Sequence, residues 1–222
     1  MKKLFFILNL VFIAAVLAST VWYLECGGLW RKGLTSFGFV VIGLVNLVYL
    51  ISQRKKPLRF PVILVVGLVL AMLGDIVLNV DFIGGAALFA VGHIFYAVSY
   101  AMLKPVEKLD VILSLVIFAE AGTFLMTAPI FDFGGGLMKG ICVGYALVIS
   151  CMFGKALTNV IRERNAVNLL LAVGSGVFVF SDIMLVLYVF ADAPKIVDIL
   201  CVATYYPAQC FLAHAIYWQR KA

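Results

Sequence analysis

Eight long apolar runs constrain what this chain can fold into. The hydrocarbon core of a bilayer is about 30 Å thick and an α-helix rises 1.5 Å per residue, so about 20 apolar residues span it as a helix. The runs predict spanning helices at residues 4–22, 34–52, 60–80, 84–102, 109–128, 138–157, 166–190 and 196–217. Because the connections are short, we expect residues 1–222 to form one all-α integral membrane domain, a bundle of eight transmembrane helices.

The composition supports a membrane protein over a soluble one. Hydrophobic residues make up 65% of the chain and charged residues 13%, whereas soluble domains carry roughly 45–50% and about 25%. A packed core cannot hide that much apolar surface from water, so lipid must cover it. The five cysteines include no C-x-x-C pair, and we interpret them as small apolar packing residues.

The basic residues predict the orientation of the helices. Four of the seventeen Lys and Arg residues fall on the side away from the N-terminus: Arg31, Lys32, Lys139 and Lys195. The other thirteen fall on the N-terminal side: Lys2, Lys3, Arg54, Lys55, Lys56, Arg59, Lys104, Lys108, Lys155, Arg162, Arg164, Arg220 and Lys221. Positive charge in short loops marks the cytoplasmic side, so we expect both termini in the cytoplasm, in a bacterial plasma membrane. The net charge of +6 then reflects topology and predicts no nucleic-acid partner.

Two features of the sequence leave alternatives open. The first 20 residues have a basic start and an apolar stretch, as a signal peptide does, but no A-x-A site closes the stretch. A retained first helix is therefore expected, and cleavage would leave seven helices in the same orientation. Residues 74–78 also resemble residues 181–185, which either reflects two parallel four-helix halves or is a coincidence.

Ionisable side chains inside the predicted helices are the first candidates for function, because an unpaired charge in the bilayer is costly. They are Asp75, His93, Glu120 and Asp182. Asp75 and Asp182 lie at similar depths, beyond the middle of their helices on the side away from the N-terminus. No Lys or Arg is expected at that depth, so His93 is the only candidate cation.

Polar residues in the same helices lie on shared helical faces. They are Asn79, Tyr96, Tyr100, Tyr205, Tyr206 and Gln209. Spacings of three, four and seven residues place such side chains on one face of a helix, and Pro207 should kink the last helix. We therefore expect four helices to enclose a wet pocket. The alternative is that the tyrosines and His93 only hydrogen-bond neighbouring helices.

Several kinds of active site are disfavoured by the sequence. With only two histidines, His93 and His214, a three-histidine zinc site cannot form. The chain has no G-x-S-x-G elbow, and Gly134–Gly136 is not followed by the Lys-Ser/Thr of a phosphate-binding loop. No metal or organic cofactor is implied.

Three blocks of residues resemble the YhhN family of membrane lysoplasmalogenases. They are Lys56-Pro57-Leu58 with Gly74-Asp75-x-x-Leu78, Phe82, Phe89, Gly92-His93 and Tyr96; Phe180-Ser181-Asp182-x-x-Leu185 with Phe190; and Tyr205-Tyr206-x-Ala208-Gln209. The family often has Ala where this chain has Val186, and Glu120 belongs to no motif of the family. The first, second, fifth and sixth helices match the family only in being apolar.

The resemblance implies a hydrolase for the vinyl-ether bond of lysoplasmalogens, with a lysophospholipid as substrate and a fatty aldehyde as one product. Such a bond is cleaved by protonation of carbon and capture of the resulting oxocarbenium ion by water, as in glycoside hydrolysis by two carboxyl groups. We expect Asp75 and Asp182 to form that pair, with the acid and base roles unassigned, and His93 to position the water or an Asp. Substrate-binding residues would be Asn79, Tyr96, Tyr205, Tyr206 and Gln209.

Two other classes of function fit the same residues. Buried acids, a kinked helix and a parallel repeat are also found in transporters for small polar or proton-coupled solutes. A non-catalytic lipid-binding membrane protein could use the polar layer only to fix helix packing. The oligomeric state cannot be read from the sequence.

Overall fold

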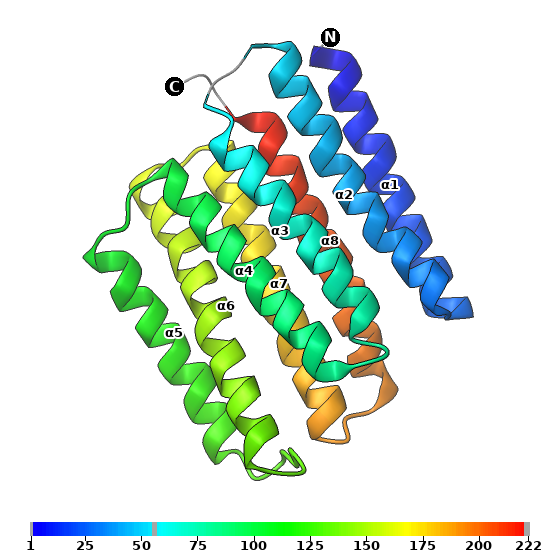
Figure 1. Cartoon of the computed structure of the whole chain (residues 1–222), viewed down its shortest axis with the longest axis vertical. Coiled ribbons are helices and arrows are strands. Elements are labelled where there is room, and N and C mark those ends of the chain that lie inside the picture. Colours follow the sequence, from blue (N-terminus) through cyan, green and yellow to red (C-terminus); the bar gives the residue numbers. More distant parts are fainter. Residues whose placement is uncertain (1, 55–56, 220–222) are drawn as a thin grey trace.

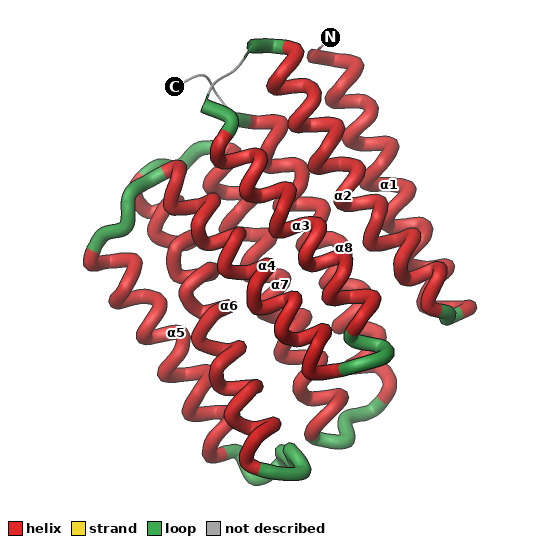
Figure 2. Tube along the Cα trace, viewed as in Figure 1, coloured by secondary structure: helices red, strands yellow, loops and turns green. Residues whose placement is uncertain are grey.

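The computed structural model describes residues 2–54 and 57–219, and these form eight long helices and one 3₁₀ turn (Figure 1). The helices are α1 (Lys2–Cys26), α2 (Leu29–Ser52), α3 (Arg59–Val77), α4 (Phe82–Leu103), α5 (Lys108–Thr127), α6 (Gly136–Arg162), α7 (Ala166–Phe190) and α8 (Lys195–Ala215), and the turn is η1 (Ile216–Trp218). The described residues contain no strand (Figure 2). Four residues counted for the orientation, Lys55, Lys56, Arg220 and Lys221, lie outside these ranges.

All eight predicted helices are confirmed, and each is long and apolar enough to cross a membrane. Two boundaries differ in a way that matters for the site. Helix α2 begins at Leu29 rather than 34, so its first turns include Lys32. Helix α3 ends at Val77 rather than 80, because the Asp81 side chain accepts a hydrogen bond from the Ile83 amide and caps the start of α4.

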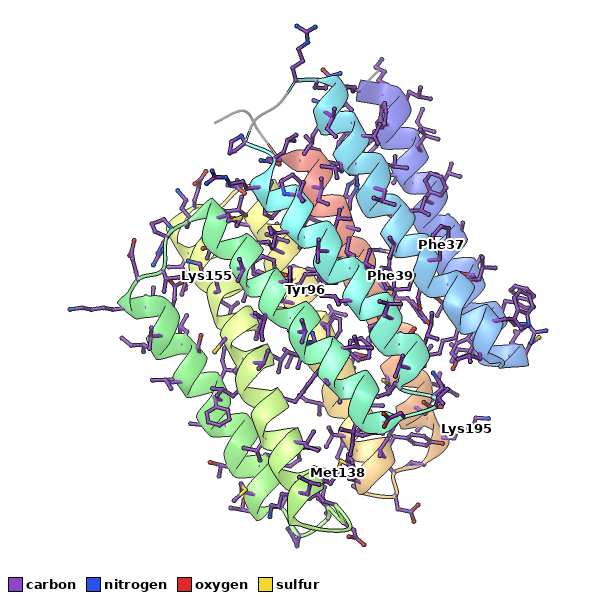
Figure 3. All side chains as sticks on the ribbon, viewed as in Figure 1. Phe37, Phe39, Tyr96, Met138, Lys155 and Lys195 are labelled. Carbon is purple, nitrogen blue, oxygen red and sulfur yellow. The ribbon has the colours of Figure 1, made fainter. Side chains whose placement is uncertain are left out.

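The chain is an integral, multi-pass membrane protein whose outer surface is apolar. On α2, Phe37 is 51% exposed and points away from the bundle, whereas Phe39 is fully buried within it (Figure 3). The start of α1 and the end of α8 lie at one end of the bundle (Figure 1), here called the terminal end. The connections α1–α2, α3–α4, α5–α6 and α7–α8 lie at the other, here called the opposite end.

Two neighbouring helix pairs are packed closely through glycine. A Cβ on Gly67 of α3 would lie 2.5 Å from the ring of Tyr96 on α4, and one on Gly174 of α7 would lie 2.8 Å from Leu212 on α8. Small residues let helix backbones approach in membranes. The α3–α4 and α7–α8 pairs are therefore tight hairpins, and α3 and α7 run in the same direction (Figure 1).

Helix α1 is tied to the bundle by buried amides. The side chains of Asn9 on α1 and Asn46 on α2 donate hydrogen bonds to each other, at 2.7 and 2.8 Å. The Asn9 carbonyl oxygen also lies 2.9 Å from Nδ1 of His214 on α8. Polar contacts between helices hold them together in lipid, where apolar burial adds little.

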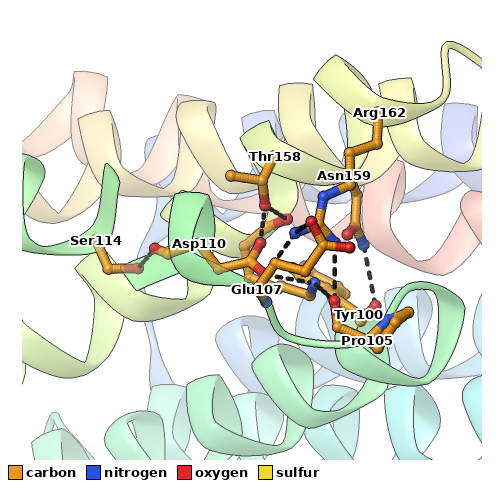
Figure 4. A network of polar contacts seen from close by, with 9 residues as sticks. Tyr100, Pro105, Glu107, Asp110, Ser114, Thr158, Asn159 and Arg162 are labelled. Carbon is orange, nitrogen blue, oxygen red and sulfur yellow. Dashed lines mark hydrogen bonds and ion pairs between the residues drawn. The ribbon is translucent and has the colours of Figure 1, made fainter. Parts of the chain in front are cut away.

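An ionic cluster joins α5 to α6 at the terminal end (Figure 4). The carboxylate of Asp110, in the first turn of α5, pairs with Lys155 and Arg162 of α6, each at 3.1 Å, and accepts a hydrogen bond from Thr158. Asp110 is 4% exposed, yet the set of buried ionisable residues predicted from sequence omits it. That set was incomplete because Asp110 lies at the edge of its apolar run.

Candidate active site

A cavity of about 320 Å³ lies near the opposite end of the bundle and contains both predicted carboxyl groups. Six helices contribute to its wall, because α1 and α2 close the side that α3, α4, α7 and α8 leave open. The polar and charged lining residues are Tyr23, Lys32, Asp75, Asn79, Ser181, Asp182, Tyr188, Asp198, Tyr205 and Tyr206.

Asp75 is buried in the last turn of α3 and is surrounded by donors. Its Oδ1 pairs with the Lys32 ammonium at 3.0 Å. Its Oδ2 accepts hydrogen bonds from Ser36 at 2.5 Å and Tyr206 at 2.9 Å. A cation and two hydroxyl donors compensate the negative charge of a carboxylate. The geometry therefore describes Asp75 as a charge-compensated carboxylate.

The expectation that His93 is the only cation available at this depth is wrong. Lys32 was assigned to a loop because the apolar run begins at 34, but α2 begins at Leu29 and carries Lys32 on its inner face. The lysine side chain is 11% exposed, so its methylene stem is buried while the ammonium reaches Asp75. Long basic side chains near helix ends extend in this way along apolar surfaces.

Asp182, on α7, has a different set of partners. Its Oδ2 accepts one hydrogen bond, at 2.7 Å, from the hydroxyl of Tyr145 on α6. Among the described residues, no Lys, Arg or His side chain forms an ion pair with it. A buried carboxyl group without a cation has no charge nearby to compensate its own. Asp75 and Asp182 thus have unlike environments.

The predicted polar companions divide into two groups, and the first lines the cavity. Tyr206 holds Asp75, and Tyr205 donates a hydrogen bond to the Ala71 carbonyl at 3.2 Å. Asn79 lies in the turn after α3, where its amide donates to the Asp75 carbonyl at 2.8 Å. These three side chains are therefore within reach of a molecule in the cavity.

The second group lies behind the wall of the cavity. Tyr96 donates a hydrogen bond to Gln209 at 2.8 Å, and this pair links α4 to α8. Tyr100 similarly lies 3.1 Å from the Ser175 hydroxyl. Their contacts fit the alternative in which the tyrosines join helices, and none of the three lines the cavity.

His93 is also enclosed by aromatic rings behind the cavity. Its ring centre lies 4.6 Å from that of Phe178 and 5.5 Å from that of Tyr145. The Phe89 carbonyl interacts with the ring, yet neither ring nitrogen has a hydrogen-bond partner among the described residues. His93 therefore bonds to neither carboxyl group, and its ring packs against Tyr145, the partner of Asp182.

Glu120 is not part of the site. It was expected among the ionisable groups inside the bundle, but its side chain is exposed on α5 and does not line the cavity. In residues 2–54 and 57–219, no three His, Cys, Asp or Glu side chains gather as a metal site would require.

Comparison with protein families identifies the chain. The model of the YhhN family matches residues 35–216, which include most of α2 and all of α3 to α8. The chain belongs to the YhhN family. No curated protein and no solved structure matched it.

The YhhN match contains Asp75, Asp182 and Tyr145 but begins after Lys32.

Sequence reasoning missed both Lys32 and Tyr145. Lys32 and Ser36 are four residues apart, so they share a helical face when α2 begins at Leu29. A prediction that began this helix before Lys32 would have placed both side chains on the helical face that meets Asp75. Tyr145 is the only tyrosine of its helix, but nothing in the sequence shows which face of α6 meets α7. Asp198, in the first turn of α8, is the third carboxyl group of the lining, and it was missed as well.

Proposed function

We propose that this YhhN protein is an intramembrane hydrolase that cleaves the vinyl-ether bond of lysoplasmalogens. The products would be a fatty aldehyde and glycerophospho-ethanolamine or glycerophospho-choline. One observation carries the proposal: one cavity is lined both by Asp75, whose charge Lys32 compensates, and by Asp182, which forms no ion pair among the described residues. Enzymes separate the roles of acid and base by placing two acidic groups in unlike environments.

Asp182 is the proposed acid. It transfers its proton to the alkenyl carbon that is β to the ether oxygen, and the π electrons of the double bond form the new C–H bond. A lone pair of the ether oxygen then stabilises the neighbouring carbon as an oxocarbenium ion. The Tyr145 hydroxyl, 2.7 Å from Oδ2, stabilises the carboxylate that Asp182 becomes.

Asp75 is the proposed base. A carboxylate offers about four acceptor positions, and Lys32, Ser36 and Tyr206 occupy three of them. A water molecule at the fourth gives its proton to Asp75 as its oxygen bonds to the oxocarbenium carbon, and a hemiacetal forms.

Collapse of the hemiacetal restores both acids. The Asp182 carboxylate takes the hydroxyl proton, the bond from this carbon to the glycerol oxygen breaks, and protonated Asp75 gives its proton to that oxygen. One water is consumed, and both groups return to their starting states. Tyr205, Tyr206 and Asn79 orient the polar part of the substrate, and His93, Tyr96 and Gln209 hold the wall in place.

The test is aldehyde release by the purified protein in detergent. The 1-alkenyl lysolipid should yield aldehyde, and the 1-acyl lysolipid with the same head group should not. Asp75→Asn and Asp182→Asn should each lower turnover about 10²–10⁴-fold, the usual contribution of general acid–base catalysis. Glu120→Gln is the matched control, because Glu120 is exposed and does not line the cavity.

The position of protonation gives a second readout. In D₂O the released aldehyde should carry one deuterium on carbon 2, because the acid delivers its proton there. No aldehyde from folded wild-type protein, or full activity in both Asp variants, would exclude the proposal. A transport assay with a proton gradient would then distinguish the two remaining classes, a transporter and a non-catalytic lipid-binding protein.

A further inference from the structure

Asp182 lies where a polar cavity meets apolar space. Besides the cavity that holds Asp75, it lines a groove of about 120 Å³ between α5, α6 and α7. The rest of that groove is almost entirely apolar, with Ala121 and Leu125 from α5, Ala146 and Ile149 from α6, and Val179 and Val186 from α7. A small apolar space of about 40 Å³ also borders Asp182 and Tyr145. We call the larger space the α5–α7 groove.

The α5–α7 groove spans the half of the bundle nearer the opposite end and includes the depth of Asp182. On α5 it reaches from Leu125, near the opposite end, to Ile117, which is about 12 Å at 1.5 Å per residue. The polar cavity lies on the other side of α7, where α3 and α8 contribute to its wall. Asp182 is the lining residue that the two spaces share, so polar and apolar space meet at its carboxyl group.

The chemistry of a vinyl ether fits this border. Its double bond is formed by the first two carbons of the hydrocarbon chain, so the reacting bond lies where the polar part of the lipid ends. A chain in the α5–α7 groove and a head group in the polar cavity would bring that bond to Asp182, with Asp75 on the side of the head group.

We propose that the α5–α7 groove binds the single hydrocarbon chain of the substrate, which enters from the leaflet at the opposite end. This proposal rests on the proposed function. Phe124 and Ile183, on the rim, are each 43% exposed, so the groove opens toward lipid and permits lateral entry. A second chain would have to occupy the cavity that contains Lys32 and Asp75, which favours one-chain lipids over two-chain lipids.

Filling the groove should change the preference for chain length. Ala121→Phe fills part of the groove, so a long chain loses more apolar contact there than a short chain, which needs less room. We expect the ratio of kcat/KM for 16-carbon over 8-carbon alkenyl lysolipids to fall about tenfold or more, because burial of apolar area drives chain binding. Ala101→Phe is the control, since Ala101 lines a separate apolar space between α4, α5 and α6. An equal fall in both variants would overturn the proposal.

A second measurement does not depend on turnover. A lysophosphatidylcholine with a photoreactive diazirine on its chain is crosslinked to the wild-type protein and to both variants, and the labelled peptides are mapped. Label should fall on residues 117–125, 142–150 and 179–186 and be lost in Ala121→Phe alone. Label elsewhere overturns the groove even if aldehyde is released. Label in the groove without aldehyde release supports the groove and counts against the proposed reaction.

Discussion

Asp75 and Asp182 are the same residue type with opposite electrostatic surroundings. Lys32, Ser36 and Tyr206 all face Asp75, whereas Asp182 accepts one hydrogen bond, from Tyr145, within the part of the chain that the structure describes. This difference supports the proposed roles of Asp182 as acid and Asp75 as base. It also predicts that the two partners Lys32 and Tyr145 matter in different ways.

Lys32→Met should destabilise the protein more than the double variant that removes the charges of both Lys32 and Asp75. Breaking a buried ion pair costs about 3–5 kcal/mol, because the remaining charge is left without compensation. The double variant Lys32→Met with Asp75→Asn leaves no such charge and should recover much of the loss. Thermal unfolding in detergent measures the stability of both variants. If Lys32→Met melts like the wild type, the ion pair contributes nothing to the folded state.

Tyr145→Phe should lower turnover with little effect on folding. The variant keeps the aromatic ring but removes the one hydrogen bond to Asp182, and hydrogen bonds to charged groups contribute about 1.5–3 kcal/mol. A loss of about 10- to 100-fold in kcat is expected in the aldehyde assay. Tyr188→Phe is the control, because Tyr188 lines the same cavity but is 39% exposed. Equal losses in the two variants would contradict the role of Tyr145.

At the scale of the helices, glycine sets how closely α3 approaches α4. The site depends on this spacing, because α3 carries Asp75 and α4 carries the aromatic residues of the wall. Gly74, the neighbour of Asp75 in the family motif, lies where a Cβ would be 3.1 Å from the Phe89 ring. The glycine of the motif therefore has a packing role next to the functional carboxylate.

Gly67→Ala should destabilise the α3–α4 hairpin. The new Cβ would lie 2.5 Å from the Tyr96 ring, and that ring is fully buried and bonded to Gln209. Overpacking of this kind costs about 1–3 kcal/mol. Gly140→Ala, on α6, meets nothing within 4 Å and should be neutral or stabilising by up to about 1 kcal/mol. Thermal unfolding compares the two, and equal melting temperatures would show that the contact is not tight.

For the whole molecule, the orientation in the membrane remains a prediction from the basic residues. Cys26 offers a test, because it is exposed at the end of α1, at the opposite end of the bundle. A maleimide that cannot cross membranes should label it in intact cells and should not label Cys26→Ser. Labelling that appears only after the cells are broken would place the opposite end in the cytoplasm.

Much of the architecture could be predicted because lipid makes hydropathy a direct measure of helix number. The eight spans follow from apolar length, and the choice of Asp75 and Asp182 follows from the cost of a buried charge. Both carboxyl groups do line one cavity.

The partners of these acids could not be predicted with the same rules. Hydropathy assigns a lysine to a loop even when its stem lies along a helix, so Lys32 was missed. The rotation of α6 about its axis depends on packing, so the contact of Tyr145 with Asp182 was also hidden. His93 shares a helical face with Tyr96, but that face is filled by aromatic rings and does not line the cavity.

The ion pair between Lys32 and Asp75 joins the first helical hairpin to the second, and this has a consequence for biogenesis. Each charge alone raises the cost of insertion, by about 2.5–3.5 kcal/mol for a residue at the centre of a helix. Lys32 leaves the ribosome before Asp75, so the first hairpin must enter the membrane with its ammonium turned toward the aqueous surface. Arrival of α3 supplies the counter-ion. The pairing of Asp75 with its cation and the docking of the first hairpin against α3 are then the same assembly step.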